Sequence, residues 1–175
     1  MKKVVLLSGS PRPNGNSSML CDEFIRGAAE VGNKAEKILL SRKKVAGCMG
    51  CNACYRNGGI CVQKDDMEEI KNKLLEADVI VLASPVYFYS MTAQLKAVID
   101  RTYSFYQELA GDFIVTCAGP GMEYTETILA ALRGFTCCVP DAKERGILCA
   151  TGVMEAGEVK AIPEFKQAYE MGKNL

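Results

Sequence analysis

The sequence predicts an α/β fold in which helices cover both faces of a parallel five-stranded sheet. Short β-branched or aliphatic runs alternate with longer segments of helical period, which is typical of βαβ units. Most of these runs are too apolar for a strand that is wetted on one face. With 175 residues and 49% hydrophobic content, we expect residues 1–175 to form one domain with a single core.

Each element follows from this alternation. We expect strands over Lys3–Leu7, Lys34–Leu40, Val79–Ser84, Phe113–Ala118 and Glu144–Ala150. The helical period predicts helices over Ser17–Val31, Asp66–Glu76, Ala93–Leu109, Tyr124–Phe135 and Pro163–Lys173. One long irregular stretch, residues 41–65, separates the second strand from the second helix and contains four cysteines. Loops of this length in compact domains are usually functional or disordered.

Composition narrows the possible functions. The 21 Lys and Arg balance the 21 Asp and Glu, so we expect no nucleic-acid or anionic-membrane partner. No apolar run approaches the roughly 20 residues of a membrane span, and Val4–Leu7 is too short for a signal-peptide core. We therefore expect a soluble cytoplasmic protein, in which nine reduced cysteines favour metal or redox chemistry over disulfides. The absence of histidine excludes imidazole-based catalysis and H-E-x-x-H zinc sites.

The segment after the first predicted strand has the features of a phosphate-binding loop. Residues 8–18 read S-G-S-P-R-P-N-G-N-S-S and lead into a predicted helix. Backbone N–H groups and the positive end of a helix dipole attract a phosphate there. The loop matches neither the Walker pattern nor G-x-G-x-x-G, which favours a mononucleotide. Taken alone, it fits an ordinary turn with Ser17 as a helix N-cap equally well.

This loop, together with S-P-V-Y-F-Y-S-M-T-A-Q-L-K at Ser84–Lys96 and the pair Asp100-Arg101, resembles the NADPH-dependent FMN reductase family of flavodoxin-like proteins. The resemblance runs from Met1 to about residue 135. It implies a three-layer sandwich with strand order 2-1-3-4-5 and bound FMN. It further implies contacts to the FMN phosphate from Ser10, Arg12, Asn16, Ser17 and Ser18, and to the isoalloxazine edge from Pro85, Val86, Tyr87 and Phe88. We expect Asp100 and Arg101 to be structural, as an ion pair or a capping contact.

A positional argument supports the same site. Ligands of open α/β sheets bind beyond the carboxyl ends of the strands, where the loops after strands one, three and four converge. In the fourth loop, small residues would let the backbone approach a flat ring, and we expect contacts from Thr116, Ala118 and Gly119. An ordinary strand-to-helix turn is the alternative for that loop.

The irregular stretch contains Cys48, Cys51, Cys54 and Cys61 in the pattern C-x2-C-x2-C-x6-C. Three thiolates at this spacing match the opening of the bacterial ferredoxin run, although the fourth lies six residues on and precedes Val62 in place of proline. Followed by D-D-M at residues 65–67, the run resembles the iron-sulfur flavoprotein branch of the family, where four cysteines ligate a 4Fe-4S cluster. Zinc, thiol–disulfide chemistry and a cluster-free loop remain alternatives.

The other cysteines are expected to be small buried hydrophobes, namely Cys21, Cys137, Cys138 and Cys149. Cys117 is the exception, because the end of the fourth strand lies near the expected flavin.

These features predict an FMN-dependent oxidoreductase that moves electrons between NAD(P)H or a ferredoxin-type carrier and a small acceptor such as a quinone or a flavin. The chemistry belongs to the flavin, so no side chain is assigned a catalytic role. We expect the cysteine loop at the same carboxyl end of the sheet as the flavin loops. There the cluster of one subunit would face the flavin of another in a homodimer or homotetramer. A non-enzymatic electron-transfer protein is the alternative, and a metal or redox sensor is a third possibility.

Overall fold

The computed structural model describes residues 1–109, 112–119 and 121–175. Its central feature is a sheet of five strands, all parallel, in the order β2-β1-β3-β4-β5. The strands are β1 (Lys3–Ser8), β2 (Lys34–Leu39), β3 (Val79–Pro85), β4 (Asp112–Gly119) and β5 (Glu144–Thr151). The predicted strands and their order are confirmed, and each strand end lies within one residue of its predicted position.

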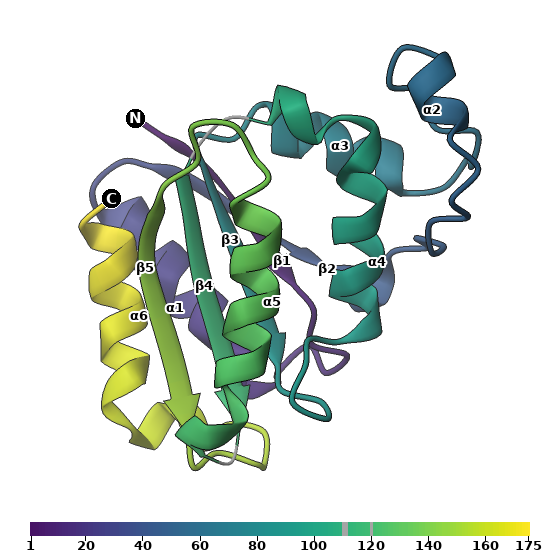
Figure 1. The fold of residues 1–175 in the computed structure, drawn as a ribbon. Helices are drawn as coiled ribbons and strands as arrows, with labels where there is room; N and C mark the ends of the chain where they lie inside the picture. The colour runs from purple at the N-terminus through teal and green to yellow at the C-terminus, as the bar shows by residue number, and fades with distance from the viewer. Residues whose placement is uncertain (110–111, 120) are drawn as a thin grey trace.

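Helices cover both faces of this sheet (Figure 1). One face carries α1 (Asn16–Glu30) and α6 (Pro163–Lys173), and the other carries α3 (Met67–Leu75), α4 (Ala93–Arg101) and α5 (Glu126–Thr136). A one-turn helix that the sequence did not predict, α2 (Ala53–Arg56), lies in the cysteine loop. The three-layer arrangement and the flavodoxin-like topology are therefore as predicted.

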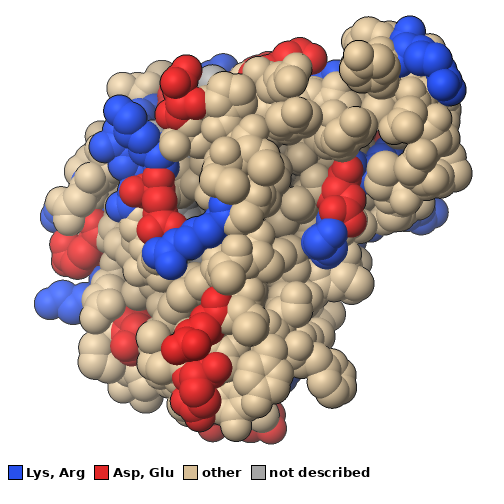
Figure 2. Space-filling view, in the orientation of Figure 1, with Lys and Arg blue, Asp and Glu red and all other residues tan. Residues whose placement is uncertain are grey.

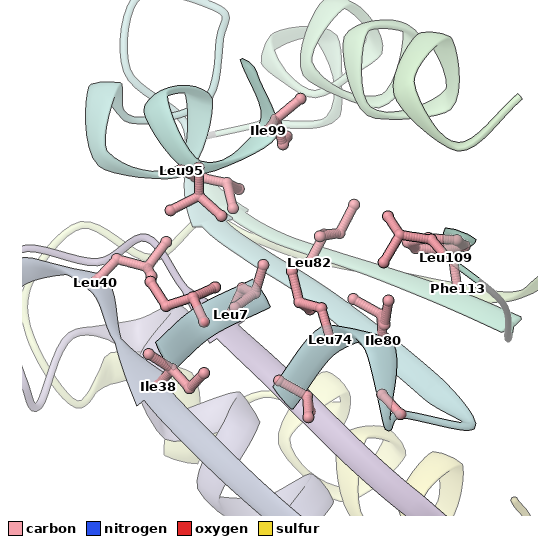
Figure 3. Packing of buried hydrophobic residues seen from close by; sticks show 14 of the residues in the cluster. Leu7, Ile38, Leu40, Leu74, Ile80, Leu82, Leu95, Ile99, Leu109 and Phe113 are labelled. Atoms are coloured by element: carbon pink, nitrogen blue, oxygen red, sulfur yellow. The ribbon is translucent and has the colours of Figure 1, made fainter. Parts of the chain in front are cut away.

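Alternating strand residues supply the two core layers. On the side of α3, α4 and α5, Leu7 and Leu82 pack with Leu74 of α3 and Leu95 of α4, all buried (Figure 3). On the opposite side, the intervening strand residues pack against buried residues of α1 such as Phe24. Each such side chain contributes about 1.5–3 kcal/mol on burial, so the sheet is held from both sides.

Two glycines set an unusually close crossing of α1 and α6. A Cβ atom built on Gly27 would lie 2.0 Å from the Tyr169 carbonyl oxygen, and one built on Gly172 would lie 2.0 Å from the Phe24 carbonyl oxygen. The helices thus touch backbone to backbone, which only glycine permits at these positions. This contact fixes α1, the helix that follows the expected phosphate loop.

The predicted helix Ala93–Leu109 is too long, because α4 ends at Arg101. Beyond it, the Thr102 hydroxyl donates to the Ile99 carbonyl oxygen at 2.7 Å, and the Ser104 hydroxyl donates to the Arg101 carbonyl oxygen at 3.3 Å. Hydroxyls that bond to nearby carbonyls compete with helical continuation. Two 3-10 turns follow, over Thr102–Ser104 and Tyr106–Glu108.

Acidic and basic side chains are interspersed on the face shown in Figure 2. Within the described ranges, no helix has both the length and the apolar character needed to cross a membrane.

Candidate functional site

A hollow of about 280 Å³ opens at the carboxyl ends of the strands, and we call it the phosphate-loop hollow. It is formed where the loops after β1, β3, β4 and β5 meet. Most of the predicted flavin residues line it: Ser10, Arg12, Asn16, Ser17, Pro85, Val86, Tyr87, Phe88, Ala118 and Gly119. The structure thus brings together residues from three distant segments, as the resemblance implied.

The N-terminus of α1 is open toward an anion. Its first turn contains no acidic residue, and no side chain caps it. The earliest backbone N–H groups of a helix have no partner within the helix. The Ser17 hydroxyl is buried and has no hydrogen-bond partner among the described atoms. A buried hydroxyl without a partner costs free energy, so this position suits a ligand that supplies an acceptor.

The loop before α1 is folded tightly on itself. The Ser10 hydroxyl donates to the Arg12 carbonyl oxygen at 2.8 Å, and the Gly15 N–H donates to the same oxygen at 3.0 Å. A Cβ on residue 15 would lie 2.5 Å from the Ser10 Oγ atom, so this turn requires glycine. The side chain of Arg12 is left exposed at the mouth of the hollow, where it can meet a negative charge.

Ser18 has a different role from its neighbour. Its hydroxyl donates to the Pro13 carbonyl oxygen at 2.6 Å and accepts from the Lys37 Nζ atom at 2.9 Å. It is buried and does not line the hollow, so the structure does not place this predicted phosphate contact at the site. The Ser18 hydroxyl instead joins the phosphate loop to Lys37 of β2.

Asn16 joins the phosphate loop to the loop after β5. Its Nδ2 atom donates to the Glu155 carbonyl oxygen at 2.9 Å, and its Oδ1 atom accepts from the N–H groups of Gly157 at 3.0 Å and Val159 at 3.3 Å. The side chain therefore positions two loops relative to each other as well as lining the hollow.

The loop after β5 is a part of the site that sequence reasoning missed. Val153 and Met154 line the hollow. The Glu158 carboxylate accepts from the N–H groups of Met154 at 2.7 Å and Glu155 at 2.9 Å, and these two bonds lower the pKa of Glu158. Two glycines after a strand, Gly152 and Gly157, were the available sequence signal, since both adopt positive φ.

An aromatic hairpin turn forms the opposite wall. Tyr87 and Ser90 exchange backbone hydrogen bonds of 2.8 and 2.9 Å, so Phe88 and Tyr89 form a two-residue turn with φ of 47° and 60°. Such turns favour Asn-Gly, and bulky residues in this left-handed region are strained by about 1–3 kcal/mol. Phe88 is fully exposed at the tip. Two lining residues that the sequence did not indicate, Tyr89 and Tyr124, pack with ring centroids 5.1 Å apart and ring planes tilted by 32°.

The loop after β4 approaches this wall closely. The Val86 N–H donates to the Ala118 carbonyl oxygen at 2.9 Å, and a Cβ on Gly119 would lie 3.0 Å from the Val86 Cγ2 atom. In β4, Thr116 pairs with Ala83 and Cys117 with Ser84. The predicted contact of Thr116 and the role of Cys117, which the sequence left open, lie outside the part that the structure describes, because these side chains are not among the described atoms.

The four-cysteine pattern forms a second hollow of about 300 Å³, which we call the cysteine hollow. All four cysteines line it, together with Met49, Val62, Asp100 and Tyr103. All four thiols are free.

The expected position of the cysteine loop was wrong. Asp100 and Tyr103 lie at the C-terminal end of α4, whereas the hairpin that lines the phosphate-loop hollow precedes the N-terminal end of that helix. Figure 1 shows the loop with α2 rising along α4, away from the arrowheads of β4 and β5. The stretch is long enough to return toward the amino ends of the strands, where contacts with residues 101–105 hold it. The two hollows are therefore separated by the length of α4, about 13 Å for nine residues.

The cysteine hollow brings four thiols to the border of one cavity. Over residues 1–109, 112–119 and 121–175, no three Cys, Asp or Glu side chains converge as ligands of one metal ion. In a cubane each thiolate binds a different iron, so four cysteines around a common cavity are a suitable donor set.

Three other cysteines depart from the expectation of burial. Cys137 and Cys138 are exposed at the end of α5, and Cys149 is half-buried. Both thiols of the vicinal pair donate to the Gly134 carbonyl oxygen at 3.3 Å, and the proximity of Cys137 raises the pKa of Cys138. Cys137 and Cys138 are exposed because they follow the last residue of α5, Thr136, in the connection to β5. Cys21 is buried as expected, and burial raises its pKa to about 12.

A third hollow, of about 840 Å³, lies between α6 and the amino ends of the strands. Lys2, Arg145 and Lys166 border it, but none of the glycine-containing loops reaches it. Volume alone therefore does not identify the site, since the converging loops and the unpartnered hydroxyl belong to the smaller phosphate-loop hollow.

Comparison with known proteins gives the same family as the motifs. An iron-sulfur flavoprotein of Archaeoglobus fulgidus is 42% identical over 124 residues, which cover 68% of this chain and 56% of that protein. An iron-sulfur flavoprotein of Methanocaldococcus jannaschii is 47% identical over 100 residues, which cover 57% of this chain and 51% of that protein. The chain thus spans about half the length of these curated relatives.

Solved structures support the fold. An NAD(P)H:quinone oxidoreductase from Methanothermobacter marburgensis superimposes with a TM-score of 0.80 at 19% identity, over 99% of this chain and 95% of that one. An FMN-dependent NADH-azoreductase from Bacillus anthracis, solved with FMN, gives a TM-score of 0.67 at 16% identity, over 98% of both chains.

The family model for NADPH-dependent FMN reductase matches residues 2–141, which include the phosphate loop, the aromatic hairpin and the cysteine loop. This chain belongs to the NADPH-dependent FMN reductase family.

Proposed function

We propose that the chain binds FMN in the phosphate-loop hollow and works as an oxidoreductase. Electrons would pass between NAD(P)H or a ferredoxin-type carrier and a small acceptor such as a quinone or a flavin. The observation that carries the proposal is the buried, unpartnered Ser17 hydroxyl beside the uncapped N-terminus of α1. A phosphate monoester supplies the acceptors and the negative charge that this position lacks.

Different residues of the hollow would contact different parts of FMN. Ser10, Arg12 and Ser17 would hold the phosphate, while the segment 85–88 and the backbone at Ala118 and Gly119 would border the ring system. FMN supplies two-electron chemistry and can also release electrons singly. The protein contributes orientation and shielding, which explains how a chain without histidine can be an enzyme.

We further propose that Cys48, Cys51, Cys54 and Cys61 hold a 4Fe-4S cluster. Their shared cavity and the names of the curated relatives support this assignment. The cluster would be a one-electron centre. The two hollows lie at opposite ends of α4 in one chain. We therefore propose that electrons pass between the flavin of one subunit and the cluster of another, in a homodimer or homotetramer. Sedimentation of the flavin-loaded protein tests this, and an active monomer would exclude it.

One experiment tests both cofactors. The protein is purified without oxygen and analysed for flavin, iron and sulfide, with a visible spectrum before and after addition of NADPH or NADH. We expect about one FMN per chain, four iron atoms, four sulfide ions and bleaching by a nicotinamide donor. Absence of flavin would refute the main proposal. Flavin without iron or sulfide, even after cluster reconstitution, would leave a simple FMN reductase.

A non-enzymatic electron-transfer protein is the second candidate, and the cysteine hollow favours it, since direct hydride transfer needs no cluster. Anaerobic turnover separates the two. Sustained reduction of a quinone by NADPH or NADH supports the enzyme, whereas reduction only by a reduced ferredoxin supports the carrier.

A further inference from the structure

Arg101, at the last position of α4, is bound to the base of the cysteine loop. Its side chain is only 2% exposed. The Nη1 atom donates to the Asp65 Oδ2 atom at 2.8 Å and the Nη2 atom donates to the Asp65 Oδ1 atom at 3.1 Å, which makes the pair bidentate. The Nη1 atom also donates to the Ala46 carbonyl oxygen at 3.0 Å. One guanidinium therefore holds a residue before the first cysteine and a residue after the last.

Asp65 completes this junction. Its carboxylate also accepts from the N–H groups of Ala46 and Met67, each at 3.1 Å. Next to it, the Lys44 N–H donates to the Asp66 carboxylate at 2.7 Å, and the Asp66 N–H donates to the Lys44 carbonyl oxygen at 3.1 Å. These bonds hold the two ends of the cysteine loop together, and we call residues 44–46 and 65–66 the loop neck.

Arg101 also lies beside Cys61. The two residues border the same cavity, with Gly59 and Phe105. Burial acts most strongly on the pKa of Arg101 and lowers it, but Asp65 and then Cys61 act in the opposite direction, and the net effect is a raised pKa. The guanidinium is therefore a permanent positive charge next to the fourth cysteine. Its Nε atom is a buried donor without a partner among the described atoms.

We propose that Arg101 is a positioning residue for the cysteine loop: through Asp65 and the Ala46 carbonyl it locks the loop neck, and it fixes a positive charge beside Cys61. The first half depends only on contacts within this chain. The second half, that this charge raises the reduction potential of the cluster, rests on the proposed cluster. Lysine is a poor substitute, because it retains the charge but loses the planar two-pronged geometry.

Limited trypsin digestion of the FMN-loaded protein, before cluster reconstitution, tests the neck. Arg101→Gln and Asp65→Asn should each accelerate cleavage after Arg56 by about tenfold or more, because each leaves a buried charge unpaired. Lys96→Gln is the matched control, since it removes the exposed Lys96–Asp100 pair (2.5 Å) from the same helix, and it should cleave like wild type. FMN affinity should stay unchanged in all three. Wild-type cleavage rates in Arg101→Gln would overturn the proposal.

Redox titration of the reconstituted cluster tests the charge. Arg101→Gln should make reduction about tenfold less favourable, which is about 59 mV for one electron, because a nearby positive charge stabilises the added electron. Arg101→Lys should retain most of the potential while still showing fast cleavage. An unchanged potential in Arg101→Gln would overturn the electrostatic half. If wild type takes up no iron, the proposed cluster itself is wrong, and the digestion result still decides the role of Arg101 in the neck.

Discussion

Replacing Ser17 with alanine tests the site, because its effects on stability and on binding have opposite signs. The Ser17 hydroxyl is buried without a partner among the described atoms. Its removal should raise the free energy of unfolding of the flavin-free protein by about 1 kcal/mol, since an unpaired buried hydroxyl is unfavourable. In the proposed FMN complex, the same change would remove a hydrogen bond to a charged phosphate, which contributes about 1.5–3 kcal/mol. The dissociation constant for FMN should therefore rise roughly 10- to 150-fold.

Ser18→Ala is the matched control, one residue further along the same helix. Because the Ser18 hydroxyl bonds to the Pro13 carbonyl oxygen and to Lys37, its loss should lower the free energy of unfolding by about 1–2 kcal/mol and leave FMN affinity nearly unchanged. Urea unfolding followed by circular dichroism gives the stabilities, and quenching of flavin fluorescence gives the affinities. Riboflavin, which lacks the phosphate, should bind Ser17→Ala and wild type equally. If Ser17→Ala destabilises the flavin-free protein and binds FMN normally, the hydroxyl is structural and the phosphate assignment fails.

Three further changes test other parts of the site and the fold. Two backbone hydrogen bonds, from Met154 and Glu155, lower the pKa of Glu158. These bonds stabilise the Met154 loop above the ordinary pKa of 4.5, and this stabilisation is lost as the pH falls through the lowered pKa. FMN affinity should therefore drop in that acid range. Glu158→Gln keeps the acceptor oxygen and should remove this pH dependence, which titrations from pH 6 down to about pH 3 measure. Phe88→Asn should raise the free energy of unfolding by about 1 kcal/mol, because asparagine tolerates positive φ and loss of the fully exposed ring removes no buried surface. Unchanged thermal unfolding would argue against backbone strain at residue 88. Gly172→Ala should cost about 3 kcal/mol or more, because the added carbon meets the Phe24 backbone, and a neutral effect on urea unfolding would contradict the close helix crossing.

The centre of the sheet was predictable because β1 and β3 are buried on both faces, so they appear as apolar runs such as Val79–Ser84. The turn between β1 and α1 was predictable because its serine, proline and glycine residues are contiguous in the sequence. The end of α4 was not predictable from helical period alone, since it depends on hydroxyl-to-carbonyl bonds at Thr102 and Ser104. The helical period of a sequence does not indicate whether side-chain hydroxyls will compete for the backbone carbonyls and end the helix.

Long-range contacts explain the larger errors. The position of the cysteine loop depends on the pairing of Arg101 with Asp65, which are 36 residues apart, and the sequence does not specify that pairing. Asn16 reaches residues more than 130 positions away, so the contribution of the loop after β5 was also hidden. The different hydrogen bonding of the adjacent Ser17 and Ser18 hydroxyls likewise requires the folded loop, because both residues are buried in the first turn of α1.

The loop neck makes the cysteine loop a separable insertion. Lys44 and Asp66 already lie within hydrogen-bonding distance, so the chain between them leaves the fold and returns to nearly the same place. Segments with this geometry can lengthen, shorten or exchange without shifting the elements that flank them. The phosphate-loop hollow and the cysteine loop can therefore change independently over evolutionary time, and Arg101 is a residue of the scaffold that a change in the loop would leave without a partner.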